Sequence, residues 1–436
     1  MRFHTPALVA TSASILAIAC AAGAVDLVRV GSGPAARADD FLGRSVATDG
    51  VRVVAGVPEH DAGAIGGAGA VAVFDRTDGA WTRTALLTAS DGATADVLGE
   101  WVDLDGGLLI ASAANVGLLS PAPWTGAAYI FEREGSAWTQ RAKLVPANPS
   151  EFMEAGLCAA IDAGTRTAVV AARLDDDIAN DVGSVGIYRE IGGAWTLEQE
   201  LHAPDAAPGD AFGFRVAIDG DVLAVATPAT DAIAESTGSV YVFERGGRGF
   251  VFRTKLMASD AAFRDRFGSS VDVDGDAIAV GAVGDDNLAP GADQGAAYVF
   301  RRTAGVWVEE AKLVAGDRAP LDALGASIAI DGDRVLVGAP SVAGGRGAAY
   351  LFERVAGGWV ETAKRTSPLA NPGDALASAV ALRGPLLVAG AQPHDFPLTN
   401  AGAVFVGTMA TPNPADLDGD GVVGATDLAI LLVNWG

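Results

Sequence analysis

Two acidic stretches of the sequence carry carboxylates at alternate positions around a glycine, as a calcium-binding loop does. One is DVDGDA, beginning at Asp272, and the other is DLDGDGVVGATDL, beginning at Asp416. A loop of the EF-hand type needs oxygen ligands at positions 1, 3 and 5, a glycine at position 6, a backbone carbonyl at position 7 and a carboxylate at position 12. Both stretches can be tested against this template.

The stretch that begins at Asp272 fails the template. Position 6 would be Ala277 and position 12 would be Val283. Related stretches at Asp219 and Asp331 keep the Asp-Gly pair but lack the first carboxylate. Because Asp-Gly between apolar runs is typical of a tight hairpin, we interpret the motif as a turn and Asp272 as an ordinary strand residue.

The C-terminal stretch fits the template completely. An apolar run, LAILLVNWG, follows it and predicts a short amphipathic exiting helix. The sequence therefore predicts a Ca²⁺ site in the tail. Its ligands are Asp416, Asp418, Asp420, the carbonyl of Val422, and Asp427, with Gly421 at the sharp turn.

Other residues that could bind a ligand or a metal ion lie between the predicted strands. We leave open whether two acidic loops hold a cation or are simply solvated: Asp175, Asp176 and Asp177 in one, and Asp285, Asp286 and Asp293 in the other. The ring proposed below makes His60 and His394 neighbours, and Trp101 and Trp124 are candidates for ligand contacts. We recognise no catalytic constellation, and we expect Cys158 to be a small buried core residue.

Composition and charge limit the class of protein. The formal net charge is −24, which argues against binding nucleic acid. The N-terminal segment, with one basic residue, an apolar run and small residues, predicts a secretory signal cleaved near Ala24; acylation at Cys20 is an alternative. No later apolar stretch is long enough to span a bilayer. We therefore expect a secreted protein, extracellular or at the cell surface.

The sequence repeats one unit seven times, at intervals of 52 to 57 residues. Each unit shares three markers. A glycine after an apolar residue opens the unit at Gly43, Gly99, Gly156, Gly213, Gly268 and Gly325, and Ala377 takes its place in the last copy. A strand such as GAAYVF begins at Gly69, Gly126, Gly183, Gly238, Gly295, Gly347 and Gly402. An aromatic residue follows at Trp81, Trp138, Trp195, Phe250, Trp307 and Trp359.

Strand periodicity divides each unit into four short strands. In the fifth unit we expect them at about 269–273, 277–283, 296–302 and 306–313. Four strands repeated about seven times predict an all-β fold, a seven-bladed β-propeller. The last unit lacks a fourth strand, so we expect the segment 24–30 to supply it and close the ring. The long variable loops then gather on one face and the short hairpins on the other.

The repeats resemble FG-GAP repeats, which occur in integrin α-subunits and in many bacterial secreted proteins. The resemblance rests on the Phe/Leu-Gly opening, on VGAP at 337–340 and on the GAAYVF strand, and it covers roughly residues 25–409. It implies a seven-bladed propeller that acts in cell adhesion or binding and not in catalysis.

The tail resembles one half of a dockerin repeat, DxDxDGxVxxxDL. It departs from that family because a dockerin has two loop-helix units and this chain has one. A lone ten-residue helix is marginal in water, so we expect it to dock on another protein such as a cohesin-like partner, to pair with a copy of itself or to serve as an address tag. A solvated tail that binds calcium loosely is the alternative. The expected organisation is a signal peptide at 1–24, a propeller at 25–409, a linker at 410–415 and a calcium loop-helix at 416–436.

Two functions from different classes remain open. The first is a secreted, non-catalytic adhesion propeller that recognises a protein or polysaccharide through its loop face, with the tail as a calcium-binding attachment or sorting motif. The second is an extracellular polysaccharide hydrolase or lyase that uses carboxylates in the central channel. Activity on a polysaccharide panel would distinguish them.

Overall fold

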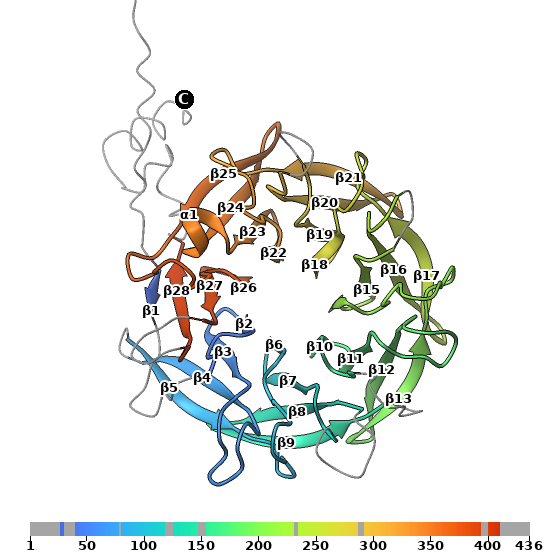
Figure 1. The fold of residues 1–436 in the computed structure, drawn as a ribbon. Coiled ribbons are helices and arrows are strands. Elements are labelled where there is room, and N and C mark those ends of the chain that lie inside the picture. The colour runs from blue at the N-terminus through green and yellow to red at the C-terminus, as the bar shows by residue number, and fades with distance from the viewer. Residues whose placement is uncertain are drawn as a thin grey trace, which may run out of the picture. The chain divides into compact units, whose positions relative to one another are not determined.

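The repeated unit folds into one blade of a ring. The computed structural model describes residues 27–29, 40–77, 80–117, 125–146, 154–230, 234–286, 292–393 and 400–409. These residues form seven antiparallel four-stranded sheets around a central axis (Figure 1). The chain from Asp26 to Met409 makes one compact unit. The predicted all-β, seven-bladed propeller is confirmed.

Blades one to four run from the axis outwards in sequence order. Their strands are β2 (Val46–Thr48), β3 (Arg52–Val57), β4 (Ala70–Thr77) and β5 (Ala80–Leu87); β6 (Val102–Asp105), β7 (Leu108–Ala113), β8 (Ala127–Glu134) and β9 (Ala137–Leu144); β10 (Ala159–Asp162), β11 (Thr167–Ala172), β12 (Ser184–Ile191) and β13 (Ala194–Leu201); β14 (Arg215–Asp219), β15 (Val222–Thr227), β16 (Ser239–Gly246) and β17 (Gly249–Leu256).

Blades five to seven follow the same plan, with one short helical turn, α1 (Val342–Gly345), in the sixth. Their strands are β18 (Phe267–Asp274), β19 (Ala277–Ala282), β20 (Ala296–Thr303) and β21 (Val306–Leu313); β22 (Ser327–Asp331), β23 (Arg334–Ala339), β24 (Ala348–Val355) and β25 (Gly358–Arg365); β26 (Ala379–Arg383), β27 (Leu386–Ala391), β28 (Ala403–Thr408) and β1 (Val28–Arg29).

The N-terminal strand closes the ring, as predicted. Val28 pairs with Val406 and Arg29 pairs with Phe405, so β1 is the outer strand of the seventh blade. A second closure joins Leu42, at the opening of the first repeat, to Gly402 through a parallel bridge. The two ends of the described propeller are therefore joined within one blade.

The first two repeat markers contact each other across the blade boundary. The apolar residue of the opening motif bridges to the glycine that starts the third strand of the preceding blade, as Leu324 does to Gly295. Gly325 has φ +92°, and a Cβ there would lie 2.4 Å from the Ala296 carbonyl oxygen. Ala377, which replaces this glycine in the last copy, keeps a positive φ of 66°. Backbone packing between blades therefore explains why the repeats open on glycine.

The hydrophobic cores lie between neighbouring blades. The second strand of each blade is buried on both faces and is almost wholly apolar, as in LLIASA of β7. Trp307 on β21 is buried in a cluster of residues from blades four and five, and its Nε1 donates to Glu244 of blade four at 3.4 Å. The aromatic marker of the outer strands therefore serves packing between blades.

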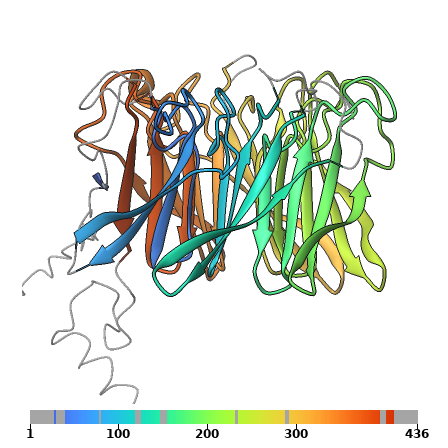
Figure 2. The ribbon, with the colours of Figure 1, turned by 90° about the horizontal axis from the view of Figure 1, so that it is seen from below.

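The two faces of the ring differ, as expected. The turns that join the first strand to the second, and the third to the fourth, are short and lie along one edge, lowermost in Figure 2. The longer connections, from second to third strand and from each blade to the next, lie along the opposite edge. We call these edges the hairpin face and the loop face. No helix in the described part of the chain is both long and apolar enough to cross a membrane.

Candidate functional site

The first strands of all seven blades line a central channel, which is hollow at both ends. A cavity of about 530 Å³ lies towards the hairpin face and is lined by residues of β2, β6, β10, β14, β18, β22 and β26. A cavity of about 360 Å³ lies towards the loop face, where the first strands begin and the second strands end. The two ends differ in charge: the charged side chains that line the first cavity are mainly aspartates, and three arginines line the second.

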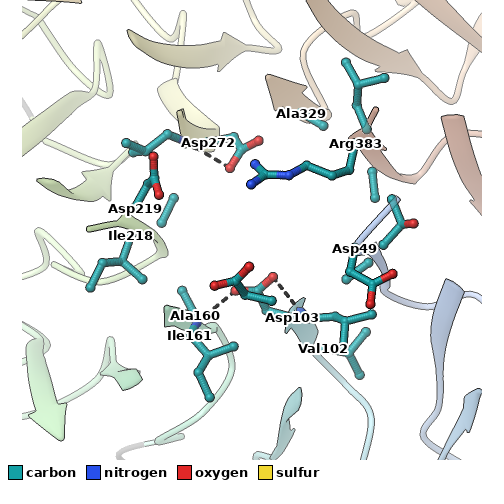
Figure 3. A pocket seen from close by; sticks show the side chains of 18 of the residues that line it. Asp49, Val102, Asp103, Ala160, Ile161, Ile218, Asp219, Asp272, Ala329 and Arg383 are labelled. Atoms are coloured by element: carbon teal, nitrogen blue, oxygen red, sulfur yellow. Dashed lines mark hydrogen bonds between the residues drawn. The ribbon is translucent and has the colours of Figure 1, made fainter. Parts of the chain in front are cut away.

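Aspartates at the hairpin end hold neighbouring blades together. In five blades the aspartate that ends the first strand accepts a hydrogen bond from a backbone N–H in the hairpin of the next blade, 2.6–3.1 Å away. In blade seven Arg383 stands in the aspartate position, and its Nη1 lies 3.6 Å from Asp274. Figure 3 shows Arg383 reaching into the channel that Asp103, Asp219 and Asp272 also line. These bonds are the structural reason for the aspartate that recurs at this turn.

Asp272 is a strand residue, in agreement with its failure to match a calcium loop. Its carboxylate accepts hydrogen bonds from the Ile330 N–H of the next blade at 2.8 Å and from the Val273 N–H at 2.9 Å. Asp103 makes the equivalent bond to Ile161 at 2.9 Å. Burial raises the pKa of Asp272 to about 7 and that of Asp103 to about 6, despite these bonds. The two carboxyl groups therefore titrate near neutral pH.

The loop end of the channel is distinguished by two large side chains at a position that is otherwise small. Two residues after the opening glycine, five blades carry Ser45, Cys158, Ser270, Ser327 or Ala379. Blades two and four carry Trp101 and Arg215 instead. The Arg215 guanidinium carbon lies 4.8 Å from the Trp101 ring centroid and 4.5 Å from that of Phe214, so the cation stacks on two aromatic rings.

Two further arginines line this cavity, each with a carboxylate partner. Arg44 donates to Glu100 at 2.8 Å and to Gln392 at 2.7 Å, and Arg173 donates to Glu154 at 2.8 Å. Arg215 differs from both, because in the described part of the chain it makes no ion pair. Its Nη1 donates to the Phe214 carbonyl at 2.8 Å.

We call the group of Arg44, Trp101, Arg173, Phe214 and Arg215 the arginine mouth. Burial lowers the pKa of Arg215, and the charges of Arg44 and Arg173 lower it further. Arginine remains charged in proteins, so this end of the channel presents a positive charge that an anionic group could neutralise. A guanidinium binds a carboxylate or a phosphate with two parallel hydrogen bonds, and of these a carboxylate is the group that proteins and acidic polysaccharides commonly carry.

Cys158 takes the same position after the opening glycine in blade three and is fully buried. Its Sγ accepts a hydrogen bond from the Val216 N–H at 3.3 Å, and burial raises the pKa of the thiol to about 11. The thiol is therefore protonated at neutral pH and is not an activated nucleophile. The expectation of a small core residue holds.

The other predicted site residues have separate outcomes. Trp101 lines the channel, and its contact with a ligand stays a prediction. His60 Nδ1 lies 3.7 Å from Asp40, whereas His394 and Trp124 lie outside the described residues. The tail ligands Asp416, Asp418, Asp420, Val422 and Asp427, the signal segment and Cys20 also lie outside them. These remain predictions.

The arginine mouth was missed by sequence reasoning. Its members come from different repeats, and none belongs to a recognised motif. One signal was present: Trp101 and Arg215 interrupt the run of small residues two positions after the opening glycine. The repeat alignment could therefore have singled out Arg215 as well as Trp101.

The comparisons with known proteins agree with this architecture. Residues 81–131, 195–243, 250–300 and 307–352 match the family model described as FG-GAP repeat, so these four segments are similar to FG-GAP repeats. Among solved structures it is similar to one described as the crystal structure of RRP9 WD40 repeats, at 10% identity and a TM-score of 0.54; the match covers 88% of this chain and 98% of that one. At this identity the likeness shows the fold alone. A search of curated proteins gave no match.

Proposed function

We propose that the protein is a secreted binding or adhesion propeller that captures a carboxylate-bearing protein or polysaccharide at the arginine mouth. An FG-GAP propeller fits a binding scaffold. The observation that carries the proposal is Arg215, a cation stacked between Trp101 and Phe214 with no ion-pair partner among the described residues. Because the chain has a net charge of −24, a cation without an ion-pair partner in the described part of the propeller distinguishes this end of the channel as a place for an anionic ligand.

The tail completes the proposed function. The calcium loop with ligands Asp416, Asp418, Asp420, Val422 and Asp427 would order the helix that follows it, because Ca²⁺ binding fixes the loop. The helix could then attach the protein to a cohesin-like partner or to a second copy of the chain. In this proposal the propeller selects the ligand and the tail sets where the protein is held.

Binding to a defined panel tests the arginine mouth. The mature protein would be titrated with polygalacturonate, with an acidic peptide and with neutral dextran. We expect binding to one of the anionic probes only, and Arg215→Ala to weaken it at least ~10-fold, the effect expected of losing a charge-assisted pair. Arg253→Ala is the matched control, because Arg253 lies on the outer strand of the same blade. Equal losses in both variants would refute the site.

A second function is favoured by one observation, the two channel carboxyl groups with pKa values near neutral. A hydrolase or lyase needs such groups for proton transfer. Both carboxylates already accept backbone hydrogen bonds from the next blade, which fits a structural role better. Activity on a polysaccharide panel that is lost in both Asp103→Asn and Asp272→Asn would establish the enzyme instead.

A further inference from the structure

A tyrosine and a lysine face each other across the outer two strands in four of the blades. The pairs are Tyr129–Lys143, Tyr241–Lys255, Tyr298–Lys312 and Tyr350–Lys364. In each pair the lysine Nζ lies 2.6–2.9 Å from an aspartate in the loop that enters the blade. These aspartates are Asp91, Asp205, Asp260 and Asp317. A lysine at this position is therefore the in-chain counter-charge of the loop carboxylate.

Blade five places a second carboxylate against its lysine. Asp285, just after β19, is only 3% exposed. Its carboxylate lies 2.9 Å from Lys312 Nζ and accepts a hydrogen bond from the Tyr298 hydroxyl at 2.5 Å. A buried carboxylate needs such partners, because a carboxylate that is buried without one is strongly destabilising.

Blade three has the same buried carboxylate without the lysine. Asp175 follows β11 as Asp285 follows β19, and it is 1% exposed. In the strand register Gly186 takes the tyrosine position and Glu200 takes the lysine position. Asn148 holds the place of the loop aspartate in the sequence and lies outside the described residues. In blade three the acidic side chain of Glu200 therefore stands where four sibling blades have the lysine.

The acidic side chains of blade three converge. Asp175, Asp177 and Glu200 each offer an oxygen, and these oxygens all lie within 4.8 Å of one another. Asp175 Oδ1 accepts a hydrogen bond from the Asp177 N–H at 2.9 Å, whereas Asp175 Oδ2 is buried and has no hydrogen-bond partner among the described residues. A buried oxygen without a partner, next to two further carboxylates, is a position that a cation would satisfy.

We propose that Asp175, Asp177 and Glu200 form a calcium site in blade three, in which Ca²⁺ takes the place of the lysine ammonium of blade five. All three ligands are hard oxygen donors, which Ca²⁺ prefers and which thiophilic metals do not. Their three negative charges exceed the two positive charges of the ion, so the site attracts the cation electrostatically.

The electrostatics of Glu200 agree with this geometry. Its pKa is raised by burial and by the negative charges of Asp175 and Asp177, while the neighbouring His202 and a hydrogen bond from Ser184 act in the opposite direction. A divalent cation would remove the repulsion that raises the pKa.

Calcium titration calorimetry on the full-length mature chain tests the site. The background variant Asp416→Ala/Asp420→Ala removes two carboxylates of the tail loop, so that any remaining heat comes from the propeller. We expect the background variant to bind one equivalent of Ca²⁺, and the further change Glu200→Lys or Glu200→Gln to abolish it. Glu200→Lys recreates the side chain of four sibling blades, and Glu200→Gln preserves the shape of the side chain if the lysine variant does not fold.

Asp176→Asn is the matched control. Asp176 lies in the same loop but accepts a hydrogen bond from the Asp181 N–H at 2.6 Å and is not part of the cluster. We expect it to leave the calcium stoichiometry of the background variant unchanged. The proposal is overturned if Glu200→Gln and Asp176→Asn bind calcium equally well. It is also overturned if the background variant binds no calcium, and binding by the wild type alone would then assign the ion to the tail.

Discussion

Blades three and five have the same four strands, the same loop after the second strand and a nearly fully buried aspartate at its third residue. They differ in what neutralises that aspartate. Blade five uses Lys312 and the Tyr298 hydroxyl, whereas blade three has Glu200 and Gly186 at those positions. These two blades thus share the place of a buried negative charge and differ in the side chains that stand beside it.

This difference explains why the acidic loops could not be separated by composition. Asp175–Asp177 and Asp285–Asp286 are both runs of aspartate in the same loop of the repeat. Asp286 caps backbone N–H groups of residues 292 and 293, and Asp285 already has its lysine. Both of these aspartates in blade five therefore already have partners, and the loop in blade three is the one that we propose to take a metal.

The largest expected effect is on the lysine of blade five. Lys312→Met should lower the free energy of unfolding by about 2–3 kcal/mol, because it leaves Asp285 buried without a cation. Lys143→Met in blade two is the control and should cost less than about 1 kcal/mol, since its partner Asp91 is half exposed. Urea denaturation measures both. Equal losses would mean that burial of Asp285 does not matter.

The next effect is calcium-dependent stability. If the ion replaces the missing lysine, wild type should gain about 2 kcal/mol of unfolding free energy at ~30-fold excess of calcium over its dissociation constant. Glu200→Lys should lose this gain and be at least as stable as wild type in EDTA. Thermal unfolding of both proteins in the tail-variant background, with and without calcium, checks the prediction. A Glu200→Lys variant that still responds to calcium would contradict it.

A smaller effect comes from the channel strands, where blade five has Asp272 and blade three has Ala160. The folded pKa of Asp272 is raised to about 7, so stability that is present at low pH is lost as the pH rises through that value. Because Asp272 is only partly buried, solvent reduces the effect of this shift, and we expect Asp272→Asn to remove the loss and to stabilise the protein by about 1 kcal/mol at pH 8. The difference from wild type should vanish near pH 4. Urea unfolding of both proteins between pH 4 and pH 8 measures this difference. A difference in unfolding free energy that does not change with pH would mean that altered packing, and not the charge of Asp272, causes it.

The smallest expected effect is on Glu200 without calcium. The pKa of Glu200 is raised in the folded protein. The free energy of unfolding therefore falls as the pH rises above the usual pKa of a glutamate and Glu200 ionises. Glu200→Gln should therefore stabilise the protein in EDTA at pH 8 by about 0.5 kcal/mol, with the gain fading towards pH 4. Excess calcium should reverse the order of the two proteins. Thermal unfolding in EDTA and in calcium measures this, and an unchanged order would count against the metal site.

Much of the architecture could be predicted from the sequence. The opening glycine and the GAAYVF strand identified seven units, and in the fifth unit the predicted strands agree with the structure to within two residues. Segment 24–30 was expected to close the ring, and β1 does so. Asp272 was separated from the C-terminal loop because its spacing fails a calcium template. These features depend on backbone conformation and on the alternation of side chains along a strand, which residues close together in the sequence determine.

The arrangement of charges depended on the tertiary structure. In the sequence Glu200 is only one polar residue of an outer strand, and Arg215 is only the first residue of an inner strand. Only the folded blade brings Glu200 to Asp175, and only the ring brings Arg215 of blade four to Trp101 of blade two. The sequence by itself determined the repeating backbone, since glycine, turns and apolar alternation act over a few residues. Packing between strands and blades decided which charged side chains lie next to one another, because electrostatic contacts join residues that sequence spacing does not relate.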